Sequence, residues 1–136
     1  MTMDAHVGDV FWCKSFPGLH GHGDKERYCA VVGNPDLTPD NKGRYLVVPT
    51  SSSSLSEYKV RMPTREDHPA CKTGLPEACD AVCDEYRLLT REQLTKSVGS
   101  TSTVMVDRIN ELVGQVIQRR LAKKSQEEYR RRGESS

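Results

Sequence analysis

The sequence predicts a mainly β domain with some helix, a small SH3-like β-barrel of about five strands. Short runs of apolar, β-branched and aromatic residues recur along the chain, and most are stopped by glycine or proline. A capping pattern and one amphipathic stretch with helical spacing follow them. At 136 residues the chain suits one domain. We expect the barrel domain over residues 1–121 and a basic, disordered tail over 122–136.

The strand candidates can be placed in order. We expect strands over residues 8–16, 28–32, 44–48, 57–62 and 81–88. The first ends at Pro17, and a glycine-rich, charged loop follows it. The second and third are continuous apolar runs stopped by Gly33 and Pro49, which is typical of strands buried on both sides in a small closed barrel. The fourth alternates polar and apolar residues like a half-exposed strand.

Two helices are expected after the strands. Thr90 and Gln93 have the spacing of a capping box, which predicts a short helix through about Ser97 that Gly99 closes. A longer amphipathic helix is expected from Val104 onward. Its wide apolar face comprises Met105, Val106, Ile109, Leu112, Val113, Val116 and Ile117. Beyond Leu121 this pattern fades, which is why the tail is expected to be disordered.

The composition indicates in which compartment the protein acts and which kinds of partner it can have. No window is apolar enough to span a bilayer, and the first residues lack the pattern of a signal peptide, so we expect a cytoplasmic protein with no membrane partner. The five cysteines are then expected to be free thiols. Residues 119–136 carry seven Lys/Arg against three Asp/Glu, a distribution that can favour nucleic acid.

Four short motifs occur in a characteristic order. They are Gly8-Asp9-Val10-Phe11-Trp12, Arg27 before Tyr28-Cys29-Ala30-Val31-Val32, Pro49-Thr50-Ser51, and Cys83-Asp84-Glu85-Tyr86-Arg87. Taken together, over roughly residues 8–118, they resemble the PemK/MazF family of toxin endoribonucleases. Two positions depart from that pattern, because the family usually has Pro where this chain has Tyr28 and Gln where it has Glu85.

The resemblance implies a catalytic site. Arg27 and Thr50 match the central catalytic pair of the family, and a guanidinium is a planar, permanently charged phosphate donor. Asp84 resembles the Asp of a Cys-Asp-Gln-Pro-Arg step in a plasmid-encoded member of the family, where it is proposed to take part in acid–base chemistry. The alternatives for these residues are a solvated loop charge, a local turn bond and a surface salt bridge.

Further residues are expected to contact RNA. They are His20, His22, Lys25, Ser51, Ser52 and Arg87. The two histidines lie in the first loop, where the plasmid-encoded relative carries one histidine, and the spacing does not decide between them. Histidine has an intrinsic pKa suited to proton transfer near neutrality. Lysine in the same loop offers a phosphate contact.

The implied function is the toxin of a type II toxin–antitoxin system. Such a toxin is a metal-independent, sequence-selective endoribonuclease that cuts single-stranded RNA through a 2′,3′-cyclic phosphate, works as a homodimer, and is silenced by a cognate antitoxin. No cofactor is implied. Two alternatives stay open: a CcdB-like toxin that binds DNA gyrase without catalysis, and a barrel that only binds nucleic acid.

One further cluster has the residue types of a zinc site. His68, Cys71, Cys79 and Cys83 supply four possible ligands, but their spacing lacks the paired short steps of a zinc finger or knuckle. Cysteine is also among the residues most often buried. We therefore expect no metal.

Overall fold

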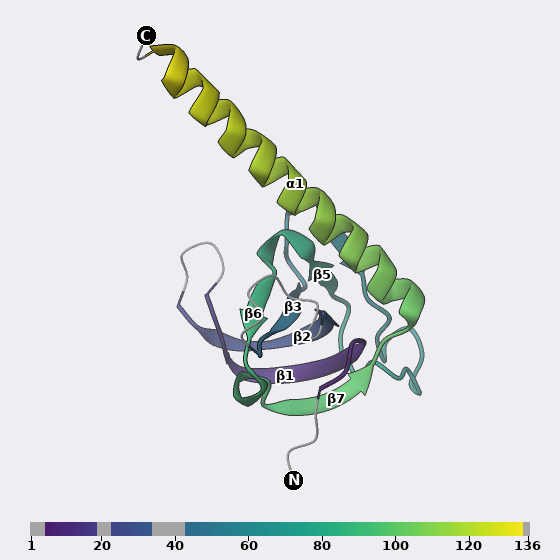
Figure 1. Ribbon diagram of the computed structural model, residues 1–136. Helices are drawn as coiled ribbons and strands as arrows, with labels where there is room; N and C mark the ends of the chain where they lie inside the picture. The colour runs from purple at the N-terminus through teal and green to yellow at the C-terminus, as the bar shows by residue number, and fades with distance from the viewer. Residues whose placement is uncertain (1–4, 19–22, 34–42, 135–136) are drawn as a thin grey trace.

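The computed structural model describes residues 5–18, 23–33 and 43–134 of the chain. Within them the chain forms seven strands, two 3₁₀ helices and one long α-helix (Figure 1). In chain order these elements are β1 (Asp9–Phe16), β2 (Lys25–Gly33), β3 (Tyr45–Ser51), β4 (Lys59–Arg61), β5 (Asp80–Val82), η1 (Cys83–Glu85), β6 (Arg87–Leu89), η2 (Arg91–Gln93), β7 (Lys96–Ser100) and α1 (Thr103–Glu134).

The strands form one antiparallel sheet in the order β4-β5-β3-β2-β1-β7, with β6 paired to β3. The first four predicted strands are confirmed as β1 to β4. Closure into a barrel is not observed, because among the described strands no pairing joins β4 to β7. Instead α1 packs against η1, β4 and β2, so its apolar residues cover the core that a closed barrel would enclose (Figure 1).

The expected last strand over 81–88 is divided into β5, η1 and β6. Thr50 of β3 lies opposite Ala81 of β5, whereas Val47 of β3 lies opposite Arg87 of β6. Ala81 and Arg87 are therefore six positions apart in the chain, whereas their partners Thr50 and Val47 are only three positions apart. The 3₁₀ turn takes up the surplus, which is a reason that an apolar pattern alone cannot show.

The short helix expected over 90–97 is wrong beyond its first turn. The capping box is present. The Thr90 backbone N–H donates to Gln93 Oε1 at 2.8 Å, and the Gln93 backbone N–H donates to the Thr90 carbonyl oxygen at 3.1 Å. Only the single 3₁₀ turn η2 follows it. The chain then continues as β7, whose pairing with the free edge of β1 outweighs the local helical signal.

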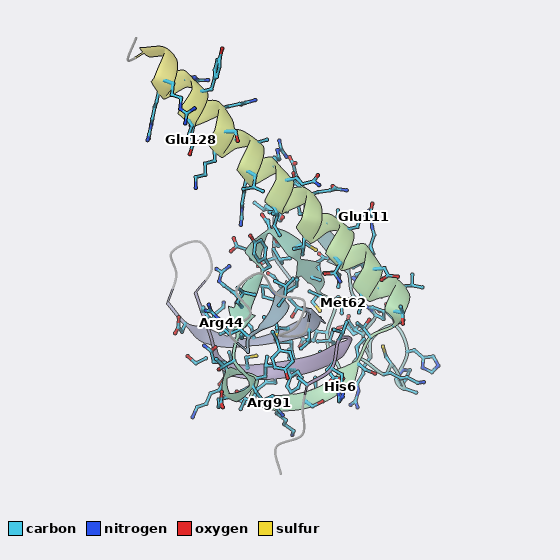
Figure 2. The ribbon with its side chains drawn as sticks, in the orientation of Figure 1. His6, Arg44, Met62, Arg91, Glu111 and Glu128 are labelled. Atoms are coloured by element: carbon cyan, nitrogen blue, oxygen red, sulfur yellow. The ribbon has the colours of Figure 1, made fainter. Side chains whose placement is uncertain are left out.

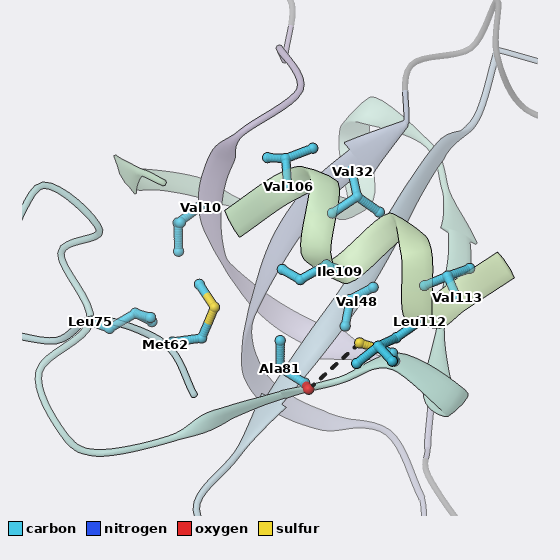
Figure 3. Packing of buried hydrophobic residues seen from close by; sticks show 11 residues of the cluster. Val10, Val32, Val48, Met62, Leu75, Ala81, Val106, Ile109, Leu112 and Val113 are labelled. Atoms are coloured by element: carbon cyan, nitrogen blue, oxygen red, sulfur yellow. Dashed lines mark hydrogen bonds between the residues drawn. The ribbon is translucent and has the colours of Figure 1, made fainter. Parts of the chain in front are cut away.

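The core lies on both faces of the central strands. Side chains alternate along each strand, so Val31 and Val47 join one cluster while Val32 and Val48 join the other. The first cluster includes Phe11, Phe16 and Leu94. The second joins the sheet to α1 through Met62, Leu75, Val106, Ile109, Leu112 and Val113 (Figure 3). The two continuous apolar runs are thus buried on both sides, as expected.

The segment between β4 and β5 lies against β7. The backbone N–H of Ser100 donates to the Lys72 carbonyl oxygen at 2.8 Å. Glycine is required on both sides of this contact. Gly74 has φ +70°, and a Cβ there would collide with the Val98 carbonyl, while a Cβ on Gly99 would collide with the Lys72 carbonyl.

The helix α1 runs well past the body of the protein. One face of its first half is buried, but every described residue from Gln118 onward is exposed, and Glu128 is seen on the projecting part (Figure 2). The expected disordered tail is therefore helical through Glu134. Alanine, lysine, arginine, glutamine and glutamate are strong helix formers, and elongation from a packed first half needs no new nucleus. No helix among the described residues is long and apolar enough to cross a bilayer.

Candidate functional site

A cleft of about 270 Å³ opens where the start of β2 meets the end of β3. Its third wall is the chain just before β5. The lining residues are Lys25, Glu26, Arg27, Tyr28, Thr50, Ser51, Ser52, Ser53, Leu75, Pro76, Glu77, Ala78 and Cys79. The structure thus brings together Arg27, Thr50, Lys25, Ser51 and Ser52, five of the residues that the sequence predicted for the site.

Arg27 combines a permanent charge with an unused donor. Its Nη1 donates to the Thr50 backbone carbonyl oxygen at 3.4 Å, which holds the guanidinium across the two strands. Its Nε is buried, and no hydrogen-bond partner for it exists among the described residues. Burial lowers the pKa of Arg27 and the nearby Glu85 carboxylate raises it, with burial the larger effect. The guanidinium can therefore donate to an anion that enters the cleft.

Thr50 is buried, with 7% of its surface exposed. Its hydroxyl donates to the Tyr28 carbonyl oxygen at 3.1 Å. The departure from the family pattern at Tyr28 leaves this contact possible, since every residue type offers a backbone carbonyl. Arg27 and Thr50 are thereby fixed beside each other on neighbouring strands. This geometry suits a pair of groups that act on the same ligand atom.

Cys79 belongs to the cleft, although the sequence suggested only zinc or burial for it. Burial raises the pKa of the Cys79 thiol, and a hydrogen bond with the Thr50 side chain partly opposes this rise. Glu26 and Glu77 also line the cleft and were not predicted. Glu77 and Cys79 come from the irregular segment before β5, whose position over β3 depends on long-range packing that no local pattern encodes.

Asp84 lies outside this cleft. Its Oδ1 accepts a hydrogen bond of 2.7 Å from Ser56 Oγ. Asp84 instead lines a second hollow beside α1, together with Arg119 and Arg120. The structure therefore does not bring Asp84 together with Arg27 and Thr50. The carboxylate that acts on Arg27 is the neighbouring Glu85.

Arg87 also lies outside the cleft lining. Its Nη2 donates to the Gly18 carbonyl oxygen at 3.0 Å and to Glu85 Oε2 at 3.2 Å. Arg87 thus fixes Glu85 and the start of the first loop. The expected contacts of His20 and His22 fall outside the described residues.

The four candidate zinc ligands do not converge. No group of three or more His, Cys, Asp or Glu side chains in the described ranges is arranged to hold a metal ion. His68 Nδ1 accepts a hydrogen bond from the backbone N–H of Ala70 at 3.2 Å. Cys83 is fully buried, and burial raises the pKa of its thiol to about 12.

Comparisons with known proteins agree on one family. Residues 6–117 match the family model described as PemK-like, MazF-like toxin of type II toxin-antitoxin system. No curated protein matches the sequence.

Solved structures of low sequence identity share the fold. MazF from Deinococcus radiodurans is similar with a TM-score of 0.61 and 14% identity, covering 86% of this chain and 99% of that one. The endoribonuclease in complex with its cognate antitoxin from a mycobacterial species gives 0.57 and 15%, covering 85% and 96%. The MazE–MazF complex from D. radiodurans gives 0.57 and 16%, covering 86% and 98%.

Proposed function

This chain belongs to the PemK-like, MazF-like toxin family of type II toxin–antitoxin systems, and we propose that it is a metal-independent endoribonuclease that cuts single-stranded RNA at selected sequences. Similar solved structures include proteins titled endoribonuclease. The observation that carries the proposal is the buried Nε of Arg27, a charged donor with no partner among the described residues, set beside Thr50 in a cleft.

The proposed reaction uses the RNA's own 2′-hydroxyl. The 2′-oxygen attacks the adjacent phosphorus and its proton leaves to a base. The bond from phosphorus to the 5′-oxygen then breaks, and that oxygen gains a proton. The products are a 2′,3′-cyclic phosphate and a 5′-hydroxyl. Negative charge builds up on the phosphorane oxygens in the transition state, so preorganised donors there lower the barrier.

Arg27 and Thr50 take this stabilising role. Arg27 presents Nε and the remainder of its fork to the scissile phosphate while Nη1 stays anchored on the Thr50 carbonyl. The Thr50 hydroxyl turns from the Tyr28 carbonyl to donate to a phosphate oxygen. Among the described residues, the carboxylates of Glu26 and Glu77 are in the cleft and can accept the 2′-hydroxyl proton.

Asp84 has a positioning role in this proposal. Its carboxylate holds Ser56, at the end of the serine segment (residues 51–56) that begins in the cleft. Lys25, Ser51 and Ser52 bind the RNA backbone beside the scissile phosphate.

The partners follow from the family. We propose that a cognate antitoxin silences the toxin, as in the antitoxin complexes among the similar solved structures. We also propose that the toxin is a homodimer that acts in the cytoplasm. A dimer interface extends the surface on which a small sheet can hold an RNA strand.

The decisive experiment is cleavage of a mixed RNA in EDTA by the wild-type protein and by Arg27→Ala and Thr50→Ala. We expect defined fragments from the wild type and a loss of at least about 100-fold in each variant, the usual effect of removing a transition-state donor. Arg108→Ala is the matched control, because Arg108 is exposed and pairs with Glu111 on α1. Folding of each variant is checked by circular dichroism.

Two results would overturn the proposal. Wild-type rates in both folded variants would remove Arg27 and Thr50 from the site. RNA left intact by the wild-type protein would favour the two non-catalytic alternatives, a gyrase-binding toxin or a nucleic-acid-binding domain.

A further inference from the structure

The buried stripe of α1 becomes cationic where the helix leaves the body. Val113 and Val116 are 2% and 3% exposed and pack into the core. Arg120 and Lys124 lie four and eight residues after Val116, so they continue the same helical face. Lys123 and Arg131 also lie on this face, with the acidic Glu127 between them. The side of the helix that faces the sheet therefore carries positive charge past the edge of the body.

A second hollow, of about 370 Å³, lies where this change occurs. It is lined by Tyr58, Asp84, Val116, Arg119, Arg120 and Lys123. Arg120 Nη2 donates to the Asp84 backbone carbonyl oxygen at 2.7 Å, and its guanidinium lies 5.4 Å from the centre of the Tyr86 ring. The Arg119 guanidinium donates to the Tyr58 hydroxyl. These contacts hold both arginines against the body.

The cations of this hollow are only partly neutralised. Arg119 pairs with Glu57 at 3.8 Å. Arg120 is held by a backbone carbonyl and a ring face, neither of which cancels its charge. Within the described ranges, no ion pair engages Arg120, Lys123 or Lys124. The hollow therefore has charge left for an anion.

The serine segment connects this hollow to the cleft. Ser51, Ser52 and Ser53 line the cleft, and Ser56 bonds Asp84 at the hollow. Five residue steps span at most about 18 Å even when fully extended. The two depressions are therefore close enough for one short RNA segment to reach both.

We propose that the hollow is a phosphate-binding subsite for the single-stranded RNA that leaves the cleft. The strand follows the serine segment, and Arg120 and Lys123 bind its backbone a few nucleotides from the cleaved bond. This inference rests on the proposed ribonuclease function. It adds a contact from residues 119–123, which lie beyond the residues 6–117 that the family model matches.

Continuity with the cleft favours RNA over an acidic protein segment. A guanidinium fork matches the geometry of phosphate oxygens, and the serine hydroxyls between the two depressions can bond the ribose–phosphate backbone. The rings of Tyr58 and Tyr86 lie under the guanidinium groups of Arg119 and Arg120 and hold these charged groups at the hollow. The carboxylates of Glu57 and Asp84 would repel either kind of anion, so the serine hydroxyls that lead to the cleft decide in favour of RNA.

The test compares Arg120→Gln/Lys123→Gln with Arg108→Gln/Arg132→Gln, which removes the same charge from other faces of the same helix. Once the cleaved motif is mapped, KM and kcat are measured on a long RNA and on one trimmed to the motif. We expect the first variant to raise KM on the long RNA about tenfold with kcat unchanged, because only flanking phosphate contacts are lost. On the trimmed RNA it should match the wild type.

Binding is measured separately, by fluorescence anisotropy with a 2′-O-methylated RNA and with a poly-glutamate peptide. The magnitude of the slope of log affinity against log salt concentration should decrease by about 1.4 in the first variant. Each single-strand phosphate contact contributes about 0.7 to that magnitude, and two contacts are lost. Equal RNA affinity and slope in all three proteins would overturn the subsite. So would a loss confined to poly-glutamate, which would assign the hollow to an acidic protein.

The design keeps the two proposals apart. A wild-type protein that binds the methylated RNA through the hollow but cleaves nothing would refute the ribonuclease function and retain the contact. Cleavage that depends on Arg27 but not on Arg120 and Lys123 would support the ribonuclease function and refute the subsite.

Discussion

At the scale of single residues, Arg27 occupies a position that function explains better than stability. A buried donor without a partner costs about 1–3 kcal/mol of folding free energy. Arg27 Nε is such a donor among the described residues. An arrangement that destabilises the free protein is useful if the binding of a phosphate in the cleft then satisfies the donor.

Arg27→Met should separate these two effects. We expect cleavage to fall at least about 100-fold, while the free energy of unfolding stays equal or rises by about 1 kcal/mol, because the side-chain volume is kept and the unpaired donor is gone. Urea unfolding followed by circular dichroism gives the second quantity. A clear loss of stability would show that Arg27 is mainly a structural anchor for β3.

Asp84 and Glu85 are adjacent acids, and the sequence alone does not show which of them lies near Arg27. The motif places both acids within one step of each other, and the resemblance favours Asp84. In η1 successive side chains point in directions about a third of a turn apart. Asp84 consequently faces Ser56 and α1, whereas Glu85 acts on Arg27. Arg27 and Thr50 were predicted from the family resemblance, and the structure extends the neighbouring apolar runs so that each lies in a strand and lines the cleft.

At the scale of elements, the contact between β7 and the segment before β5 depends on glycine. The carbonyl oxygens of Lys72 and Val98 occupy the places where side chains on Gly99 and Gly74 would stand. Both obstacles are backbone atoms, which cannot move aside as a flexible side chain does. The close approach is therefore a property of these two positions.

Gly99→Ala should destabilise the protein by about 2 kcal/mol or more, because the added methyl group forces the backbones apart. Gly114→Ala is the opposite case. Gly114 lies within α1 and a Cβ there meets nothing within 4 Å, so alanine should stabilise by about 0.5–1 kcal/mol. The urea midpoint should fall for Gly99→Ala and rise for Gly114→Ala. Midpoints that shift in the same direction would contradict the close contact at Gly99.

Removing the chain after Leu121 should leave the melting temperature unchanged. The described residues beyond Leu121 are exposed and make no part of either core cluster. Differential scanning calorimetry of the full chain and the shortened chain checks this. A drop of more than about 4 °C would correspond to roughly 1 kcal/mol and would mean that the distal helix packs on something.

The elements themselves were predictable to different degrees. The strands up to β4 and the start of α1 carry clear periodicity, and the structure has them. The capping box predicts helix where β7 forms, because it is a purely local signal, while the strand is selected by the remote edge of β1. The helical end of α1 was missed because its residues lack a buried face, although their intrinsic propensity favours helix.

At the scale of the whole molecule, the described residues offer charged and hydroxyl groups for catalysis but no converging metal ligands. If Arg27 and Thr50 stabilise the phosphorane as proposed, the rate should be the same with and without EDTA, and the upstream product should end in a 2′,3′-cyclic phosphate. Mass spectrometry of a short RNA product identifies that end group. Activity lost on chelation and restored by a divalent ion would point to a metal-assisted hydrolysis.

The fold as a whole followed from the sequence except for its closure. The continuous apolar runs of β2 and β3 predicted strands buried on both faces, and both core clusters exist. Whether the sheet closes depends on how α1 and the edge strands compete for the same apolar surface. That competition involves residues far apart in the chain, so no local pattern decides it.

The backbone contact that joins β7 to the segment before β5 also affects how this protein can evolve. Residues 75–79 form a wall of the cleft, while residues 71–74 immediately before them are fastened to β7 through backbone contacts. If the cleft binds RNA as proposed, point changes in the wall can alter which bases fit while the contact with β7 stays intact. Insertions or deletions would shift Gly74 out of register with Gly99. New sequence preferences are therefore more accessible to this lineage through substitution than through changes in loop length.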